Sequence, residues 1–326
     1  MKIAIDTMGG DLGPVEVIKG AYEARKEKNF TPVFIGKVEE IEEGLKEFDF
    51  GKDVEIVDAR EMIENDEEPA LTIRKKKNSP IVVGANLLAD GEVDSFLSSG
   101  STGALLAAGL FIVKRIEGVE RAAISVFLPT AKGKALMLDA GANMDSKPEY
   151  LLNFAIMGSI YSKEVEGIES PRIALLNVGL EEGKGNKLTK EVYELLKEAD
   201  INFIGNIEAR EILSGDADII VTDGFAGNIA LKAIEGTAKT LLSEVKKVML
   251  KNAKTKFGAL LIKNELKETL KHFDYRETGA APLLGIRKPI FKAHGSSDYL
   301  AYKNAIFQVI KFSEKNVIDN IIKFGG

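Results

Sequence analysis

The chain contains 326 residues, of which 45% are hydrophobic, and it carries a formal net charge of −6. A chain of this length buries roughly three quarters of its unfolded surface, so one large or two closely joined domains are stable without a covalent staple. The sequence contains no cysteine, which excludes disulfides, thiolate metal ligands and a cysteine nucleophile. The acidic balance argues against an overall basic, nucleic-acid-binding surface, and we expect no nucleic acid as a partner.

The chain opens directly on an apolar segment, Lys2–Asp6, that is typical of a buried strand. No signal-peptide pattern precedes it and no apolar run is long enough to span a bilayer, so we expect a cytoplasmic protein. A turn-rich loop follows, and then a helix predicted over residues 15–26. Ligands of open α/β sheets bind at the carboxyl ends of strands. We therefore expect this loop to line a substrate cleft with Asp6, Gly9, Gly10 and Asp11.

A strand predicted over residues 93–98 runs into a loop of small residues and then into a helix. Ser101 or Thr102 can cap this helix, and the unpaired N–H groups of its first turn point into the loop. Glycines let an anion approach the backbone, and the helix end carries a partial positive charge. The loop is therefore a candidate phosphate site formed by Gly100, Ser101, Thr102 and Gly103. The alternative is a tight turn whose small residues serve packing alone.

Two later strands repeat the arrangement of a strand followed by a polar loop. One ends at Asp139, and the other ends at Asp223 before the glycine-rich loop Gly224–Asn228. A helix is predicted to follow over residues 229–239. These units predict an α/β protein with a doubly wound, mostly parallel sheet and a cleft at the carboxyl ends of its strands. We assign three more residues to that cleft, Asp139, Asp223 and, from the loop before the last long helix, Ser296.

Two further loops contain candidate functional side chains. A strand over residues 173–177 leads into Gly179–Asn186, in which Lys184 lies between two glycines. Such a lysine can reach an anion, although an exposed hinge explains the pattern equally well. His294 and Ser296 lie in a glycine and serine loop at the start of the last long helix. A lone histidine is more often structural than catalytic, but this position makes a functional role nearly as plausible.

Five motifs along the chain together resemble the bacterial phosphate acyltransferases of phospholipid synthesis. They are Ile3–Asp11, Ser99–Ala104, Gly183–Asn186, Thr222–Asn228 and Ala293–Asp298. Each motif is unspecific alone, but their order and spacing cover the whole chain. Members of that family often carry a polar residue where this chain has Leu12 and an asparagine where it has Ser101. Serine retains a hydrogen-bonding helix cap, so the proposed role of the loop does not depend on this difference.

The resemblance implies transfer of a long-chain fatty acyl group from acyl carrier protein to inorganic phosphate. The acyl phosphate would supply a glycerol-3-phosphate acyltransferase. The resemblance also implies a homodimer. Its fold would be related to phosphotransacetylases and to isocitrate and isopropylmalate dehydrogenases, with one α/β catalytic unit over residues 1–326. Lys184 would join the phosphate loop, while Asn186, Asn228 and His294 would contact the oxyanion or the leaving thiolate. We expect no metal and no cofactor, because phosphate is itself the nucleophile.

Three other functions are alternatives to this one. A nicotinamide-dependent dehydrogenase would need a dinucleotide fingerprint and a carboxylate cluster for a divalent metal, and the sequence shows neither convincingly. A short-chain phosphotransacetylase acting on acyl-coenzyme A is a nearer alternative. A non-catalytic lipid-binding module is the third, and it would release no thiol in the presence of phosphate.

The region at about 241–273 differs in composition from the rest of the chain. Apolar residues recur there at helical spacing, which predicts a protruding pair of amphipathic helices. Gly258 is expected to break the helix and leave an apolar tip of Phe257, Leu260, Leu261 and Ile262. Eight lysines and two glutamates lie within Lys246–Lys271. This charge suits a peripheral contact with an anionic membrane or an acidic carrier protein, although the helices could instead form a dimer interface.

Overall fold

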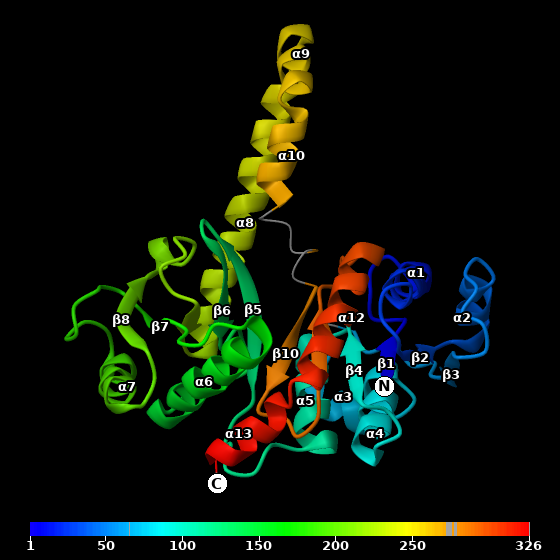
Figure 1. Ribbon diagram of the computed structural model, residues 1–326, viewed down its shortest axis with the longest axis horizontal. Helices are drawn as coiled ribbons and strands as arrows, with labels where there is room; N and C mark the ends of the chain where they lie inside the picture. The colour runs from blue at the N-terminus through cyan, green and yellow to red at the C-terminus, as the bar shows by residue number, and fades with distance from the viewer. Residues whose placement is uncertain (65, 272–275, 277–278, 326) are drawn as a thin grey trace.

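The computed structural model describes residues 1–64, 66–271, 276 and 279–325. Its core is one 11-stranded sheet with the strand order β3-β2-β1-β4-β11-β10-β5-β6-β9-β7-β8 (Figure 1). The strands are β1 (Lys2–Asp6), β2 (Thr31–Gly36), β3 (Glu55–Asp58), β4 (Ser95–Ser98), β5 (Ala123–Thr130), β6 (Gly133–Leu138), β7 (Ile173–Asn177), β8 (Phe203–Glu208), β9 (Ile219–Val221), β10 (Ala280–Leu284) and β11 (Ile290–Ala293).

The sheet is mostly parallel, as the sequence predicts. Strands β3, β2, β1, β4 and β11 pair in parallel on one side, and β6, β9, β7 and β8 do so on the other. The strands between them, β10 and β5, pair antiparallel with each other and with their outer neighbours. The carboxyl ends of β1, β4 and β11 therefore meet at one edge of the sheet.

Helices cover both faces of this sheet (Figure 1). They are α1 (Pro14–Arg25), α2 (Val38–Leu45), α3 (Pro69–Lys75), α4 (Pro80–Asp90), α5 (Thr102–Ala108), α6 (Pro148–Tyr161), α7 (Lys187–Glu198), α8 (Gly224–Met249), α9 (Ala253–Leu261), α10 (Lys263–Lys271), α12 (Tyr299–Glu314) and α13 (Val317–Gly325). Short helices η1 (Gly109–Val113), η2 (Ser162–Glu166) and η3 (Ala209–Glu211) complete the fold.

Two apolar layers follow from the alternation of side chains along the strands. In β1, Ile3 and Ile5 belong to one buried cluster, whereas Ala4 belongs to the other. The first cluster contains residues of α1, α6 and α12, and the second contains residues of α4 and α5. The sheet is thus buried on both faces, as expected for a mostly parallel sheet.

Local sequence determines where many helices begin. Prolines occupy the first turn of α1, α3, α4 and α6, where a missing N–H costs nothing. Other helices start after a side chain that accepts a main-chain N–H of the first turn. These caps are Ser79 for α4, Ser101 for α5, Asn186 for α7, Asp223 for α8, Asn252 for α9 and Asp298 for α12.

Helices α8, α9 and α10 form a helical hairpin that projects away from the sheet (Figure 1). The sequence-based placement of its turn at Gly258 is wrong, because Gly258 lies inside α9. The turn instead falls where α8 ends at Met249 and Asn252 caps α9. Phe273, expected at the end of the second helix, lies outside the described residues. Within the described part of the chain, no helix combines the length and apolarity that crossing a bilayer requires.

Candidate active site

The loops that follow β1, β4 and β11 converge at the carboxyl edge of the sheet. The main-chain N–H of Asp11 donates to the Gly295 carbonyl at 2.8 Å, which joins the first loop to the third. Gly9 packs directly on the second loop, since a Cβ there would lie 2.7 Å from the Gly100 Cα. A Cβ at Gly10 would meet the Tyr302 hydroxyl at 2.7 Å. The sequence-predicted residues of these three loops are therefore brought together.

Asp6 lies beneath the first loop. Its carboxylate accepts the Ser98 hydroxyl at 2.6 Å and the N–H groups of Met8 and Gly9 at 2.9 and 3.0 Å. The residue is 2% exposed, and this burial raises the pKa of its carboxyl against the opposing effect of those hydrogen bonds. The expected place of Asp6 in the substrate cleft is thus corrected to a buried position that shapes the loop.

The predicted phosphate loop caps its helix as expected. The Ser101 hydroxyl accepts the N–H of Ala104, and α5 begins at Thr102. Packing accounts for one of its glycines, because a Cβ at Gly103 would lie 2.7 Å from the Pro69 Cγ of α3. Gly100 and Thr102 are half-buried, whereas Ser101 is buried. Packing thus explains Gly103, whereas the expected phosphate site at this loop stays a prediction.

Lys292 is a member of this site that the sequence analysis missed. It lies in β11 opposite Ser98 of β4, and its ammonium donates to the Ser99 carbonyl at 3.0 Å and to the Ala293 carbonyl. Burial lowers its pKa to about 8, although Asp6 and Asp11 act in the opposite direction. A single lysine in the otherwise apolar Ile290–Ala293 is the signal that could have identified it.

His294 is exposed in the loop after β11. Its Nδ1 lies 2.9 Å from the Ser296 hydroxyl and also accepts the Ser296 N–H. Desolvation and the cations Lys292 and Lys232 lower the pKa of the imidazole, while Glu235 and Asp11 oppose them. Lys232 and Glu235 belong to α8, so charges on this helix act on His294.

A second group of predicted residues surrounds the start of α8. Asp139 is fully buried and accepts main-chain N–H groups from Ile124 and from the loop after β6, so it shapes this loop rather than lining the cleft. Asp223 caps α8 by accepting the N–H groups of residues 225 and 226. The predicted loop over residues 224–228 is in fact the beginning of that helix.

Asn228 therefore lies on a helix, where its side chain contacts the loop after β6. A Cβ at Gly141 would lie 3.5 Å from the Asn228 Cγ. Asn228, Lys232 and Glu235 are spaced by four and three residues, so they share one face of α8. Two of the three act on His294. The shared face thus bears one side chain that contacts the loop after β6 and two charges that act on His294.

The strand order does not place Lys184 with the phosphate loop. Strands β4 and β7 are separated by β11, β10, β5, β6 and β9, which corresponds to roughly 25–30 Å at the usual strand spacing. Lys184 is exposed, and Asn186 caps α7 by accepting the Thr189 N–H at 2.9 Å. Lys184 and Gly100 of one chain are therefore too far apart to hold the same phosphate, and the expected cradle that combines them is wrong. A separate catalytic role of Lys184 and Asn186 stays a prediction.

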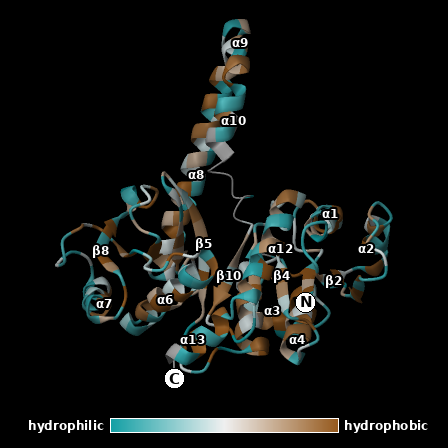
Figure 2. Ribbon diagram, in the orientation of Figure 1, coloured by the Kyte–Doolittle hydropathy of each residue, from teal (hydrophilic) through white to brown (hydrophobic). Residues whose placement is uncertain are grey.

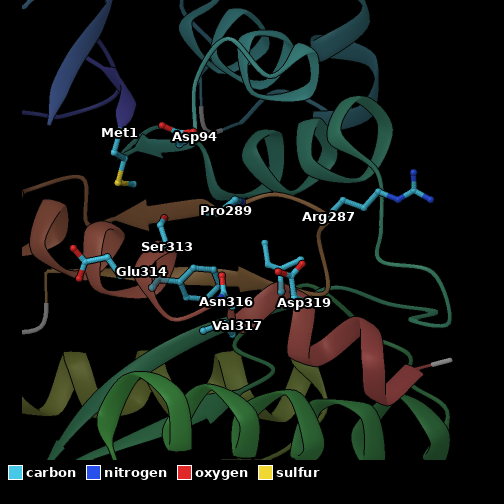
Figure 3. Close-up of a pocket in the computed structure, with 11 residues that line it drawn as sticks. Met1, Asp94, Arg287, Pro289, Ser313, Glu314, Asn316, Val317 and Asp319 are labelled. Carbon is cyan, nitrogen blue, oxygen red and sulfur yellow. The ribbon is translucent and has the colours of Figure 1, made fainter.

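The pocket in Figure 3 lies at the opposite edge of the sheet. Met1, Asp94 and Pro289 line it, and each immediately precedes β1, β4 or β11 at its amino end. Its volume is about 590 Å³, and residues of α12 and α13 close one side. Because Gly100, Thr102 and His294 follow the carboxyl ends of β4 and β11, this pocket is separate from the loops that bear them. Within the described residues, no group of three His, Cys, Asp or Glu side chains is arranged to hold a metal ion.

Comparison with known proteins places this chain in a family. The family model described as "Fatty acid synthesis protein" matches residues 1–320. Phosphate acyltransferase of Clostridioides difficile (strain 630) is 48% identical over 326 residues, covering 99% of this chain and 96% of the relative.

Solved structures confirm the predicted fold class. A phosphotransacetylase from Streptococcus pyogenes superposes with a TM-score of 0.63 at 20% identity, covering 97% of this chain and 94% of that one. The 4-hydroxythreonine-4-phosphate dehydrogenase from Klebsiella pneumoniae gives a TM-score of 0.52 at 12% identity, covering 96% and 98%. At these identities the likeness concerns the fold alone. The family match and the close relatives establish that this chain belongs to the fatty acid synthesis protein family that includes the phosphate acyltransferases.

Proposed function

We propose that this protein transfers a long-chain fatty acyl group from acyl carrier protein to inorganic phosphate. The observation that carries the proposal is the 48% identity to a phosphate acyltransferase, which covers 99% of this chain. The geometry supports it, since the glycine-rich loops after β1 and β4 and the His294 loop meet at one edge of the sheet. Such loops bind anions through main-chain N–H groups.

In the reaction, a phosphate oxygen attacks the carbonyl carbon of the thioester. A C–O bond forms, the C–S bond breaks, and the carrier thiolate leaves. The loop residues Gly100 and Thr102 would orient the phosphate, which converts the attack into an intramolecular step. Asn228 on α8 and His294 on the facing loop would receive charge that develops on the carbonyl oxygen or the thiolate. The chain needs no covalent acyl-enzyme for this chemistry.

A short-chain phosphotransacetylase is the second candidate, favoured by the fold shared with the Streptococcus pyogenes enzyme. The two functions differ in acyl length and carrier. The test follows thiol release from palmitoyl-acyl carrier protein and from acetyl-coenzyme A, each with and without phosphate. The proposal predicts phosphate-dependent release from the carrier protein at a much higher kcat/KM. Preferential turnover of acetyl-coenzyme A would favour the alternative, and release from neither donor would indicate a non-catalytic module.

We also propose that the exposed apolar side chains of α9, the helix that follows the hairpin turn, contact an anionic membrane surface. Phe257, Leu260 and Leu261 of α9 are each about two-thirds exposed, at 64%, 66% and 66%. Figure 2 shows hydrophobic and hydrophilic residues alternating along the projecting hairpin. Lysines on both sides of these residues favour anionic head groups by about 1 kcal/mol each near the surface. A poorly soluble acyl phosphate would leave the enzyme most easily there.

The membrane proposal is tested by flotation with phosphatidylglycerol vesicles and with phosphatidylcholine vesicles at low salt. Leu261→Glu should abolish flotation with the anionic vesicles. Ile204→Glu is the matched control, because Ile204 is 46% exposed on β8, far along the chain from the hairpin. Equal flotation of wild type and Leu261→Glu would contradict the proposal.

The homodimer expected from the family resemblance stays a prediction, which a sedimentation measurement of the oligomeric state would test.

A further inference from the structure

We propose that the ammonium group of Lys292 is the cation that holds inorganic phosphate in the cleft. This inference rests on the proposed function and adds a residue to it. Lys292 is half-buried on β11, which lies next to β4 in the sheet. Its Nζ donates to the Ser99 carbonyl at 3.0 Å, one residue before the glycine and serine loop. The cation therefore lies where the three loops meet.

The hydrogen bonds of Lys292 do not include a direct ion pair. Its two acceptors are the main-chain carbonyls of Ser99 and Ala293, which are neutral. Among the ion pairs of the described residues, none joins Lys292 to a carboxylate within 4 Å. The charge of the buried Asp6 acts on Lys292, but the hydrogen bonds of its carboxylate are with Ser98 and two N–H groups. A partly desolvated cation without a counterion is costly, and a bound anion removes that cost.

The surroundings of Lys292 also predict how its charge depends on pH. The charged groups acting on it include two acids from the β1 side and one cation from α8, namely Asp6, Asp11 and Lys232. His294 and Glu235 lie in the same electrostatic network, and the Tyr302 hydroxyl bonds Ser99. Burial exceeds the effect of the acids and lowers the pKa of Lys292 to about 8. The cation is therefore present at neutral pH and is lost as the pH rises above 8.

A second lysine, Lys288, makes similar hydrogen bonds but lies at the other end of β11. Lys288 donates to the carbonyls of Leu88 and Ala89 at 2.7 and 3.1 Å, but it precedes β11 and lies at the amino end of the strand. Substituting either lysine removes two bonds to main-chain carbonyls. Only substitution of Lys292 removes a cation from the loops of the candidate site. Lys288→Met is thus a control for the structural part of the change.

The experiment measures inorganic phosphate binding by isothermal titration calorimetry in the absence of an acyl donor. We expect Lys292→Met to weaken binding ~100-fold, the scale found for loss of one preorganised charge-stabilising group. Lys288→Met should bind as wild type does. Lys292→Arg retains the charge and should bind within ~10-fold of wild type. Unchanged phosphate affinity in folded Lys292→Met would overturn the inference.

A pH series keeps the inference testable if Lys292→Met fails to fold. Wild-type affinity for phosphate should fall as the pH rises above 8, whereas Lys292→Arg should keep its affinity over that range. Equal pH dependence in both proteins would contradict the assignment, as would a wild type that binds no phosphate. Lys292-dependent binding without formation of acyl phosphate would reject the proposed function while supporting the phosphate site.

Discussion

Replacing Asp139 by alanine tests how the loop after β6 is held against α8. The carboxylate is fully buried and accepts hydrogen bonds from Ile124, Gly141, Ala142 and Asn143 at 2.7–3.2 Å. The loop in turn receives the start of α8, since the Gly224 N–H donates to the Asn143 carbonyl at 2.8 Å. The substitution therefore leaves several buried N–H groups without an acceptor and loosens the support of the helix that bears Asn228.

The magnitude follows from these bonds. Each buried donor left without a partner costs about 1–3 kcal/mol, but the costs are not additive. Burial also raises the pKa of Asp139, so removing the buried carboxylate recovers part of the cost. We expect a net loss of about 4 kcal/mol, or a drop of roughly 10 °C in Tm for a chain of this size.

Thermal unfolding followed by circular dichroism measures this loss. Asp223→Ala is the matched comparison, because Asp223 accepts two N–H groups at 2.9 Å as a half-buried helix cap. Loss of a cap costs about 1 kcal/mol. The reasoning is refuted if Asp139→Ala lowers Tm by no more than Asp223→Ala does.

Three other predictions concern activity. Gly9→Ala should lower kcat/KM for phosphate at least ~10-fold, since the new Cβ would displace Gly100. Kinetics equal to wild type would show that the contact between the loops after β1 and β4 does not affect catalysis. Asn228→Ala should lower kcat by ~100-fold if it contacts the developing charge, and an unchanged kcat would remove it from the site. Activity should persist in EDTA, because amides, hydroxyls and a lysine are the phosphate ligands invoked; loss in EDTA that magnesium restores would contradict this.

Much of the sheet could be predicted from local pattern. Strands that combine an apolar run with a following turn, such as β1 and β7, were recognised within one residue of their bounds. The edge strand β8 and the antiparallel strand β10 were not recognised. Phe203–Glu208 has intermediate burial and a glycine, while Ala280–Leu284 contains a proline, so neither shows clear periodicity.

The site was predicted in part, because motifs show which loops are polar but not which strands are neighbours. Lys184 follows a strand with the same pattern as β4, yet the strand order separates them. Lys292 was missed because it lies within a strand rather than a loop. The helix start at Gly224 was read as a loop, since glycines there suggested a turn whereas the Asp223 cap extends the helix. Long-range strand pairing decides the positions of Lys184 and Lys292 relative to the phosphate loop.

The most direct measurement is hydroxylamine trapping of the product formed from palmitoyl-acyl carrier protein and inorganic phosphate. Acyl phosphate reacts with hydroxylamine to give palmitoyl hydroxamate, and a reaction without phosphate corrects for attack on the thioester itself. The account predicts hydroxamate that requires both enzyme and phosphate and that equals the carrier thiol released. Thiol release with no phosphate-dependent hydroxamate would contradict it.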